Sequence, residues 1–348
     1  MRQPCSLIEG PFLHDLLAQP EAVAGTCRAL RHADLGTIPE RFHEGAFDRI
    51  VLTGMGSSHH ALHVTAPELA ATRRPVILIE TSELVQVQSG LLTDRTLLVA
   101  VSQSGESAEI RRLVERIPAG CCLVGVTNSP ASALARSAAV ALSTAAGAET
   151  TVACKTYLAA VTALLWFTGT LRGAEPRTAA ADLAPAAAAI AHYLSTWRDH
   201  VGQLADLLPA VRRLYLTGRG ASLAAAGQGA LTLKEAARFP AEAMGTAAFR
   251  HGPLEVLGPE STVVVLEGPA TLAPLNLRFL EDLRGLGANV LQLGRRSIHP
   301  PFRIPPVSDR LLPLVEILPL QLTSLALAAL AGREAGCFRF ATKITRAD

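Results

Sequence analysis

Short apolar runs alternate along the chain with longer stretches in which apolar residues recur at helical spacing. Most of these runs are rich in β-branched residues and leucine and end in turn-forming residues, and a helical stretch follows. This order is typical of βαβ units, in which helices join parallel strands, and near-continuous apolar strands indicate a sheet covered on both faces. The runs expected to form strands are RIVLTG (49–54), PVILIE (75–80), TLLVAV (96–101), CCLVGV (121–126), RRLYLTG (212–218), STVVVLEG (261–268) and ANVLQLG (288–294).

One of these patterns occurs twice. RIVLTGMGSS at 49–58 and RLYLTGRGAS at 213–222 share an arginine, a leucine, a threonine, two glycines and a serine at equivalent positions. An alanine-rich segment between them, residues 178–197, is expected to be helical, with Pro185 as a break or a start. The repeat predicts an α/β protein of two tandem doubly wound, flavodoxin-like domains with parallel sheets, over residues 1–176 and 177–348.

Composition excludes several classes of protein. Of the 348 residues, 49% are apolar and 18% charged, which is enough apolar material for a folded core. The net charge is only +2, and no basic run is interleaved with aromatic residues, so nucleic acid is not an expected partner. Pro, Glu and Gln interrupt apolar runs such as residues 311–332, which therefore read as buried helices and not as membrane spans. The N-terminus shows no signal-peptide pattern, so a cytoplasmic location is expected.

Cysteine and histidine spacing predicts no metal site. The six cysteines form no C-x-x-C pair and are expected to be reduced thiols. His59, His60 and His63 cluster, but no carboxylate or cysteine accompanies them at ligand spacing.

The glycine pairs also fail to match nucleotide-binding motifs. A dinucleotide fingerprint needs a third glycine where this chain has His59 in one copy and Leu223 in the other. Glu80, at the end of an expected strand, could imitate the ribose-binding acid, so a nicotinamide cofactor is the weaker alternative. The Walker pattern is absent from the sequence, and no cofactor is expected.

The most informative loop is VAVSQSGESAEI at residues 99–110, which we call the serine loop. It places four polar residues between an apolar strand and an amphipathic helix, where hydroxyl groups and a helix N-terminus together can bind a phosphate dianion. The alternative is that Ser104 merely caps the helix and Ser107 completes a capping pattern. The equivalent stretch of the second copy, VVVLEGPATL, lacks the serines, so only one copy is expected to bind phosphate.

Together these motifs resemble the sugar isomerase (SIS) domain family. GMGSS followed by SQSGES, in a tandem chain, is similar to the isomerase half of glucosamine-6-phosphate synthase and to stand-alone aminosugar-phosphate deaminases and fructosamine-phosphate deglycases. The resemblance covers essentially the whole chain. The further stretches that match are LLAQPEAV (16–23), GAETTVACKT (147–156), GALTLKEAARFPAEAMGTAAFRHGPLEVL (229–257), LPLQLTSLALA (318–328) and FRFATKIT (338–345).

The resemblance implies a role for each matched residue. Glu235 would be the base that moves a proton between C1 and C2 of the sugar. His251 would assist ring opening in the site of a partner subunit, which implies a homodimer with shared sites, and Lys343 would close over the site and can form a Schiff base. The residues assigned to the sugar phosphate are Ser57 through its backbone and Ser58, Ser102, Gln103, Ser104 and Ser107. Without the resemblance, Glu235 reads as a solvated helix residue, His251 as a turn residue and Lys343 as a surface lysine.

The chain also departs from the family pattern. Thr232 stands where the synthase pattern L-K-L-K-E has its first lysine, and Cys154 replaces a serine that would contact the sugar, so a thiol would have to donate there. The following pair reads Lys155–Thr156, an inversion of the family order. No glutamine amidotransferase domain precedes the first copy, which predicts a catabolic direction.

The expected function is therefore an aminosugar-6-phosphate deaminase–isomerase that gives fructose 6-phosphate and ammonia from glucosamine 6-phosphate. A fructosamine-6-phosphate deglycase is the alternative, because it would use the same residues. A non-catalytic sugar-phosphate sensor is disfavoured, since no basic recognition helix stands at the N-terminal end of the sequence.

Overall fold

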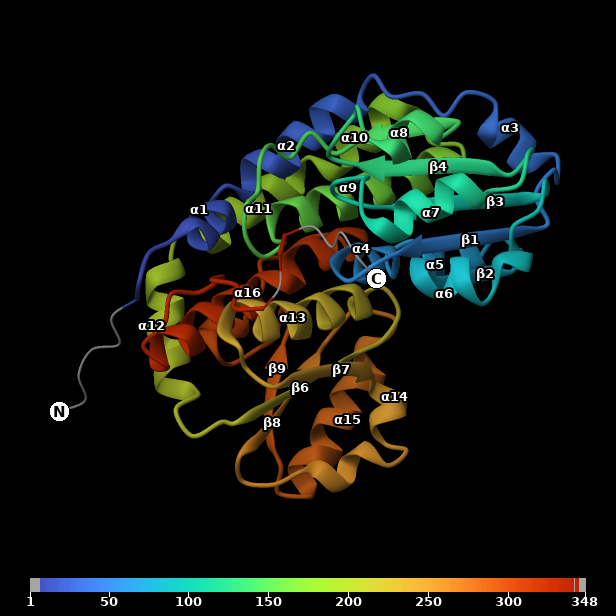
Figure 1. Ribbon diagram of the computed structural model, residues 1–348. Helices are drawn as coiled ribbons and strands as arrows, with labels where there is room; N and C mark the ends of the chain where they lie inside the picture. Colours follow the sequence, from blue (N-terminus) through green and yellow to red (C-terminus); the bar gives the residue numbers. More distant parts are fainter. Residues whose placement is uncertain (1–6, 341, 344–348) are drawn as a thin grey trace. The chain divides into compact units, whose positions relative to one another are not determined.

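The computed structural model describes residues 7–340, 342 and 343, and the chain divides into two compact units, each with one parallel sheet (Figure 1). The first-sheet unit comprises residues 21–148, 155–185, 342 and 343. The second-sheet unit comprises residues 7–20, 149–154 and 186–340. In the sequence, all strands of the first sheet precede residue 176 and all strands of the second sheet follow residue 177. The domain boundary expected between these two residues stays a prediction.

The first sheet has five parallel strands in the order β2-β1-β3-β4-β5. This is the flavodoxin-like order, in which the chain moves from β1 to one neighbour, β2, and then crosses to the other, β3. The strands are β1 (Arg49–Gly54), β2 (Val76–Glu80), β3 (Thr96–Val101), β4 (Cys122–Thr127) and β5 (Val140–Ser143). The helices and the 3-10 turn of this part of the chain are α2 (Gln19–Leu30), α3 (Ile38–His43), α4 (Ser57–Leu62), α5 (Ala66–Ala70), α6 (Thr81–Gln86), η1 (Ser89–Leu91), α7 (Ala108–Arg116), α8 (Ala133–Ser137), α9 (Lys155–Leu171) and α10 (Pro176–Leu183).

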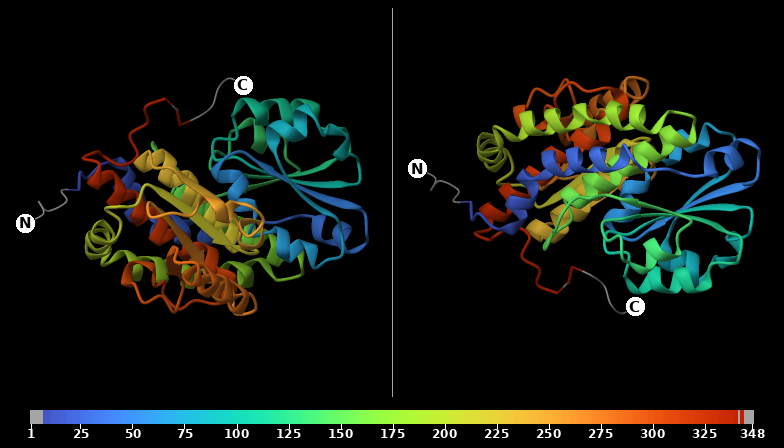
Figure 2. Two further views of the ribbon diagram at one scale, coloured as in Figure 1. Left: turned by 90° about the horizontal axis from the view of Figure 1, so that it is seen from below. Right: turned by 90° about the horizontal axis from the view of Figure 1, so that it is seen from above.

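Helices cover both faces of this sheet (Figure 2). Successive strand residues point to opposite faces, so Leu98 and Ala100 of β3 pack into a core with residues of α6, α7 and α8. The other face is covered by α9, of which all but two residues are buried. Strands buried on both faces can be apolar throughout, which is why β3 and β4 have no exposed residue.

The second sheet has four parallel strands in the order β7-β6-β8-β9. An isolated parallel bridge between Gly294 and Arg303 continues it beyond β9, at the place of a fifth strand. The strands are β6 (Arg213–Gly218), β7 (Ala241–Gly245), β8 (Ser261–Leu266) and β9 (Asn289–Leu293). The helices and 3-10 turns are α1 (Pro11–Leu17), α11 (Pro185–Leu194), α12 (Trp197–Leu207), α13 (Ser222–Ala237), α14 (Thr246–Phe249), η2 (Pro253–Val256), α15 (Ala273–Gly285), η3 (Pro300–Phe302), η4 (Asp309–Leu311) and α16 (Leu312–Leu330).

Helices α13 and α16 pack closely together on one face of the second sheet. A Cβ atom at Gly229 of α13 would lie 2.3 Å from Leu320 of α16 and 3.1 Å from Leu216 of β6, so only glycine allows this approach. On the other face, α14 and α15 enclose an aromatic core that includes Tyr215, Phe249 and Phe279. The second unit is therefore also covered on both faces of its sheet.

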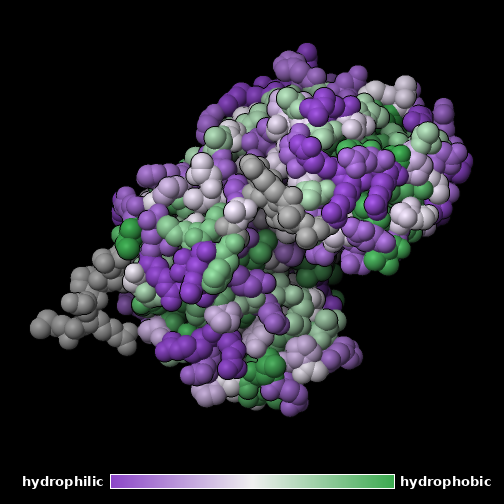
Figure 3. Space-filling view, viewed as in Figure 1, coloured by the Kyte–Doolittle hydropathy of each residue, from purple (hydrophilic) through white to green (hydrophobic). Residues whose placement is uncertain are grey.

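In the described part of the chain, one helical stretch, Asp309–Leu330, is long and apolar enough to cross a membrane. Its most apolar window is 100% buried within the structure, as in the core helix of a folded unit, which meets the same criteria of length and composition. The burial expected for this apolar run is therefore observed. On the molecular face shown in Figure 3, hydrophilic and hydrophobic residues are interspersed.

The structure confirms the α/β class and both parallel sheets, and it adds two strands that the pattern did not predict. β5 has four residues, and β7 has the sequence AEAMG, which contains no β-branched residue. Both are edge strands, where pairing with one neighbour suffices and apolar periodicity is weak. Pro185 begins α11, so the alanine-rich segment is divided into separate helices at that residue.

Candidate functional site

Two loops of the first-sheet unit leave neighbouring strands at the same edge of the sheet. Gly54 at the end of β1 is paired with Val101 at the end of β3, so the stretches 55–58 and 102–107 begin side by side. The strand order reverses between β1 and β3, and open α/β sheets bind ligands at the carboxyl ends of strands where this reversal occurs. The structure therefore brings Ser57 and Ser58 to the same edge as the serine loop.

Hydrogen bonds within the serine loop fix its shape. The Ser102 hydroxyl oxygen accepts a bond from the Gly105 backbone N–H at 3.1 Å, and the Ser104 hydroxyl oxygen accepts one from Glu106 N–H at 3.2 Å. Gly105 has φ of 62°, and a Cβ atom there would lie 2.2 Å from the Ser132 hydroxyl oxygen. The turn therefore requires glycine both for its backbone conformation and for its contact with Ser132.

The residue that precedes helix α7 is Ser107, not Ser104. Ser107 has extended backbone angles, and its side chain makes no capping hydrogen bond. Ser132 shows the contrast, because its side chain accepts a bond from Ala135 N–H and caps α8. The Ser107 hydroxyl is thus not used for capping, and the first-turn N–H groups of the nine-residue α7 point towards the loop. This arrangement can hold an anion, since a helix N-terminus carries partial positive charge and unpaired donors.

In the second-sheet unit, carboxylates occupy the equivalent edge. Glu267 directly follows β8, as Ser102 directly follows β3. Its carboxylate is buried and accepts bonds from Gln292 Nε2 at 3.0 Å and from Arg296 Nε at 2.9 Å. A buried carboxylate, paired with Arg296, thus stands in this loop where the first copy has Ser102, and phosphate binding by only one copy stays a prediction.

A second carboxyl group, Glu316 of α16, is fully buried in the same unit. Its Oε1 accepts a bond from the Ser222 hydroxyl at 3.0 Å, and Oε2 has no partner among the described residues. Burial raises the pKa of Glu316 to about 7, while bonds from Ser222 and the charge of Arg295 act in the opposite direction. A buried carboxyl with an unpartnered oxygen favours its neutral form.

His59 and His60 lie in the short helix α4, after the first glycine pair, and His63 directly follows the helix. The rings of His59 and His63 are 5.9 Å apart. Burial lowers the pKa of His59, and burial together with His59 lowers the pKa of His63 to about 4, so both rings are neutral near neutral pH. Within residues 7–340, 342 and 343 there is no group of three or more side chains that could hold a metal ion.

One face of α13 carries Gln228, Thr232 and Glu235, which are spaced four and three residues apart. The Gln228 Nε2 donates to the Thr232 hydroxyl oxygen at 3.2 Å and to the Ala153 carbonyl oxygen at 3.1 Å. Gln228 and Thr232 are buried, and Glu235 is half-buried at the end of this row. The structure therefore joins segment 149–154 to the helix face that carries the expected base.

Cys154 lies at the end of that segment and is buried. Its backbone N–H donates to Glu149 Oε1 at 3.0 Å, and its thiol lies 3.6 Å from the same oxygen. The thiol is thus directed to Glu149, and the sugar-contacting role expected at this position stays a prediction.

The remaining expected residues lie in loops. His251 follows α14 and is exposed in the second-sheet unit, and its N–H donates to the Ala248 carbonyl oxygen. Lys343 is half-buried and groups with the first-sheet unit. The catalytic roles of Glu235, His251 and Lys343 stay predictions.

Four polar residues of these clusters escaped prediction from the sequence: Gln228, Glu149, Glu267 and Glu316. Only Glu316 gave a signal, since it is a single acid within the apolar run LPLVEILPL. The other three look like ordinary loop or helix residues. The partners of Gln228 and Glu267 lie in distant parts of the sequence, and Glu149 pairs with Cys154, five residues further along.

Comparison with known proteins identifies the family. The SIS domain model matches residues 47–167 and 207–292, which together make up more than half of the chain and contain the strands of both sheets except the last residue of β9. The chain belongs to the SIS domain family. This confirms the resemblance and the tandem arrangement of two SIS domains.

Among curated proteins, the chain is similar to glutamine–fructose-6-phosphate aminotransferases [isomerizing]. It is 32% identical to the protein of Pyrococcus horikoshii over 297 residues, which cover 82% of this chain and 50% of that protein. It is 28% identical to the protein of Leifsonia xyli subsp. xyli over 344 residues, which cover 91% of this chain and 56% of that protein. The chain therefore spans about half the length of the curated relatives it matches.

Solved structures share the whole SIS fold. The C-terminal domain of glucosamine-fructose-6-phosphate aminotransferase from Francisella tularensis has a TM-score of 0.81 at 23% identity and covers 95% of this chain and 99% of that one. Glucosamine-6-phosphate deaminase from Thermotoga maritima has a TM-score of 0.76 at 16% identity, with 97% and 100% covered. Tagatose-6-phosphate ketose/aldose isomerase from Escherichia coli has a TM-score of 0.75 at 20% identity, with 94% and 95% covered. At these identities the likeness concerns the fold.

Proposed function

We propose that this SIS protein is a phosphosugar enzyme that converts an aminosugar 6-phosphate into a ketose 6-phosphate and ammonia. The observation that supports this proposal most directly is the serine loop beside the β1 loop, with the Ser107 hydroxyl and the α7 N-terminus left for an anion. Phosphate is the anion that such a site suits, because hydroxyl and backbone N–H donors can surround its oxygens.

Glu235 is proposed to move the proton. It removes the C2 proton of the open-chain aminosugar, and the proton returns to C1, which leaves an imine at C2. Water then adds to the imine, and ammonia leaves, so that glucosamine 6-phosphate and water give fructose 6-phosphate and ammonia. His251 of a second copy is proposed to assist ring opening, and Lys343 to close over the substrate, in a homodimer with a cytoplasmic location.

The pair formed by Gln228 and Thr232 departs from the family pattern on the face of α13 that carries Glu235. Where the family pattern places a lysine, this chain has a buried hydroxyl bonded to a buried amide, and both groups are uncharged. The reaction proposed here therefore does not use a lysine at position 232.

The test is ammonia release with glucosamine 6-phosphate and with fructoselysine 6-phosphate, in parallel with the formation of ketose or aldose phosphate. The proposal expects ammonia and fructose 6-phosphate from the first substrate only. Release of lysine from the second would instead identify a fructosamine-6-phosphate deglycase. Binding of both sugars without turnover would indicate a sensor and contradict an enzyme.

A further inference from the structure

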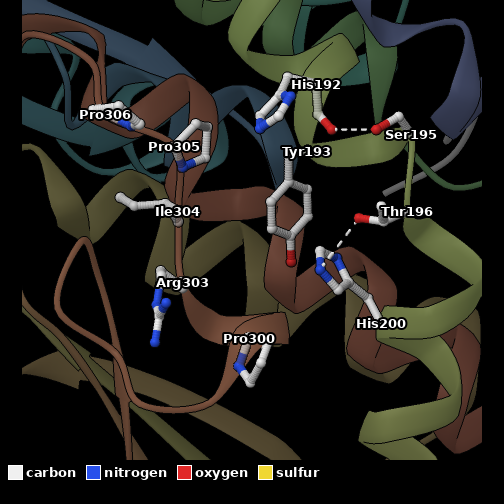
Figure 4. Close-up of a pocket in the computed structure, with 10 residues that line it drawn as sticks. All are labelled: His192, Tyr193, Ser195, Thr196, His200, Pro300, Arg303, Ile304, Pro305 and Pro306. Carbon is white, nitrogen blue, oxygen red and sulfur yellow. Dashed lines mark hydrogen bonds between the residues drawn. The ribbon is translucent and has the colours of Figure 1, made fainter.

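A cavity of about 290 Å³ lies in the second-sheet unit, beside the continuation of β9 (Figure 4). The end of α11, the start of α12 and the segment from η3 to Pro306 enclose it. In the sheet order β7-β6-β8-β9, His251 follows β7 at the opposite edge, so this cavity shares no residue with the candidate site. The lining residues are His192, Tyr193, Ser195, Thr196, His200, Pro300, Arg303, Ile304, Pro305 and Pro306.

Half of the lining is apolar and rigid. Tyr193 is buried, its hydroxyl donates to the Pro301 carbonyl oxygen, and its ring centroid lies 4.7 Å from that of His200. In Figure 4 the Tyr193 ring stands between the two histidines and faces the side where Ile304 and the prolines lie. Proline rings fix the backbone φ and Tyr193 is held by its hydroxyl, so this wall is formed before any ligand binds.

The fixed positive charge of the lining is Arg303. Its backbone is held by the bridge to Gly294, and its Nε donates to the Ser297 carbonyl oxygen at 2.8 Å. No ion pair is found for its guanidinium group in the described part of the chain, and the lining residues include no carboxylate. The Nη atoms are therefore available to an acceptor, and a guanidinium fork suits a bidentate acidic group.

Three other polar residues of the lining, Ser195, Thr196 and His200, contribute hydrogen-bonding groups to the cavity and no fixed charge. The Ser195 hydroxyl donates to the His192 carbonyl oxygen, and the Thr196 hydroxyl lies 3.4 Å from His200 Nε2 (Figure 4). Burial lowers the pKa of His200, against the opposing charge of Asp199, so its imidazole is neutral near neutral pH. Arg303 is thus the constant cation beside an apolar wall.

We propose that this cavity binds a small cyclic organic anion, whose ring packs on Tyr193 and the prolines and whose acidic group pairs with Arg303. The volume is close to the lower end of ligand pockets, roughly 300 Å³, and suits a single ring. An apolar wall with one orienting polar group is the usual design of a small-molecule site.

The experiment is calorimetric titration of the full chain with benzoate, phenyl phosphate and inorganic phosphate. The first two present the same ring with a carboxylate or a phosphate, and the third is an anion without a ring. We expect one saturable site for at least one ring anion, with a Kd on the order of 1 mM or tighter. Arg303→Gln should weaken this binding at least about tenfold, because the charged pair is lost.

Matched variants decide where the probe binds. Arg284→Gln removes an exposed arginine of α15 in the same unit and should leave binding unchanged. The double variant Ser102→Ala/Ser104→Ala should also leave it unchanged, which separates this site from the serine loop. If Arg303→Gln does not fold, Thr196→Trp serves instead, because it places a large side chain at the exposed rim of the cavity.

Three results would overturn the proposal. One is no saturable binding of either ring anion up to about 20 mM. Another is binding that survives Arg303→Gln or Thr196→Trp, or that is lost in the serine-loop variant. The third is inorganic phosphate binding as tightly as the ring anions in the Ser102→Ala/Ser104→Ala variant, which would give the apolar wall no part in recognition.

Discussion

The Gln228 side-chain amide bridges two parts of the second-sheet unit by donating both to the Thr232 hydroxyl oxygen on its own helix and to the Ala153 carbonyl oxygen. Gln228 and Thr232 are both fully buried. Residue 228 is far from residue 153 in the sequence, so this amide fixes the segment 149–154 to the face of α13 that carries Glu235. The relationship makes Gln228 a structural support of the candidate site.

Replacing Gln228 should therefore cost more stability than replacing Thr232. Gln228→Leu leaves the half-buried Ala153 carbonyl and the buried Thr232 hydroxyl without their donor, at about 1–3 kcal/mol for a buried unpaired group. Thr232→Val keeps the bond from Gln228 to Ala153 and should cost about 1 kcal/mol. Urea unfolding of both variants measures the difference. Equal losses would mean that the bond to Ala153 contributes little.

The Ser107 hydroxyl is expected to matter for substrate binding and not for folding. Because it makes no capping bond, Ser107→Ala should leave the melting temperature unchanged. The loss of a hydrogen bond to phosphate, about 1.5–3 kcal/mol, should raise KM roughly tenfold to a hundredfold. Thr271→Ala, in the exposed loop after β8, is the control and should change neither quantity. A similar rise in KM for both variants would refute the asymmetry between the two copies.

Glu235→Gln tests the proposed base. The amide keeps the shape of the side chain but cannot accept the C2 proton, so kcat should fall by roughly 10²–10⁴ while KM changes little. Thermal unfolding of the variant controls for damage to α13. Full turnover by a folded variant would make Glu235 an ordinary residue of the helix surface.

Glu316 should make stability decrease as the pH rises. The pKa of Glu316 is about 7 in the folded protein and 4.5 when unperturbed. Between pH 4.5 and pH 7 the carboxyl group therefore holds a proton in the folded protein that it has lost in the unfolded chain. The contribution is fully present below pH 4.5 and is lost as the pH rises through 7, at about 1.4 kcal/mol per pH unit in this window. Glu316→Gln cannot titrate and should lack this loss.

The measurement is the free energy of unfolding in urea at about pH 5 and about pH 8. The wild-type protein should lose stability between these two pH values. Glu316→Gln should lack this loss, so its free energy of unfolding should rise relative to that of the wild-type protein at the higher pH. Glu281→Gln, on the exposed face of α15, is the matched control and should run parallel to the wild-type protein. Parallel behaviour of Glu316→Gln as well would show that Glu316 does not bind a proton on folding.

The proposed dimer predicts recovery of activity in a mixture. Glu235→Gln and His251→Ala are each expected to be inactive, and subunit exchange would form pairs with one doubly mutated site and one intact site. Random exchange of equal amounts would leave about a quarter of all sites intact. Activity near that level supports a shared site. Absence of recovery, with exchange shown by native mass spectrometry, would place His251 in the site of its own chain or outside catalysis.

The sequence by itself determined the α/β class, most of the strands and the serine loop. These features depend on neighbouring residues: apolar runs form the buried strands, and the serines follow directly after one of them. The repeat of RIVLTGMGSS as RLYLTGRGAS likewise places both glycine pairs at the ends of strands, and in the structure Gly54 and Gly218 are the last residues of β1 and β6. The family followed from the same local motifs, and the matched model confirms it.

Only the tertiary structure decided which polar groups meet. Whether Ser107 caps α7 depends on a side-chain rotamer, and the contacts of Glu267 with Arg296, of Glu316 with Ser222 and of Gln228 with Ala153 join residues that the chain separates by 29, 94 and 75 positions. Edge strand β7 exists because β6 offers it a partner, not because its own residues favour a strand. Periodicity reports which face a residue occupies, but the partner on that face is set by the packing of distant segments.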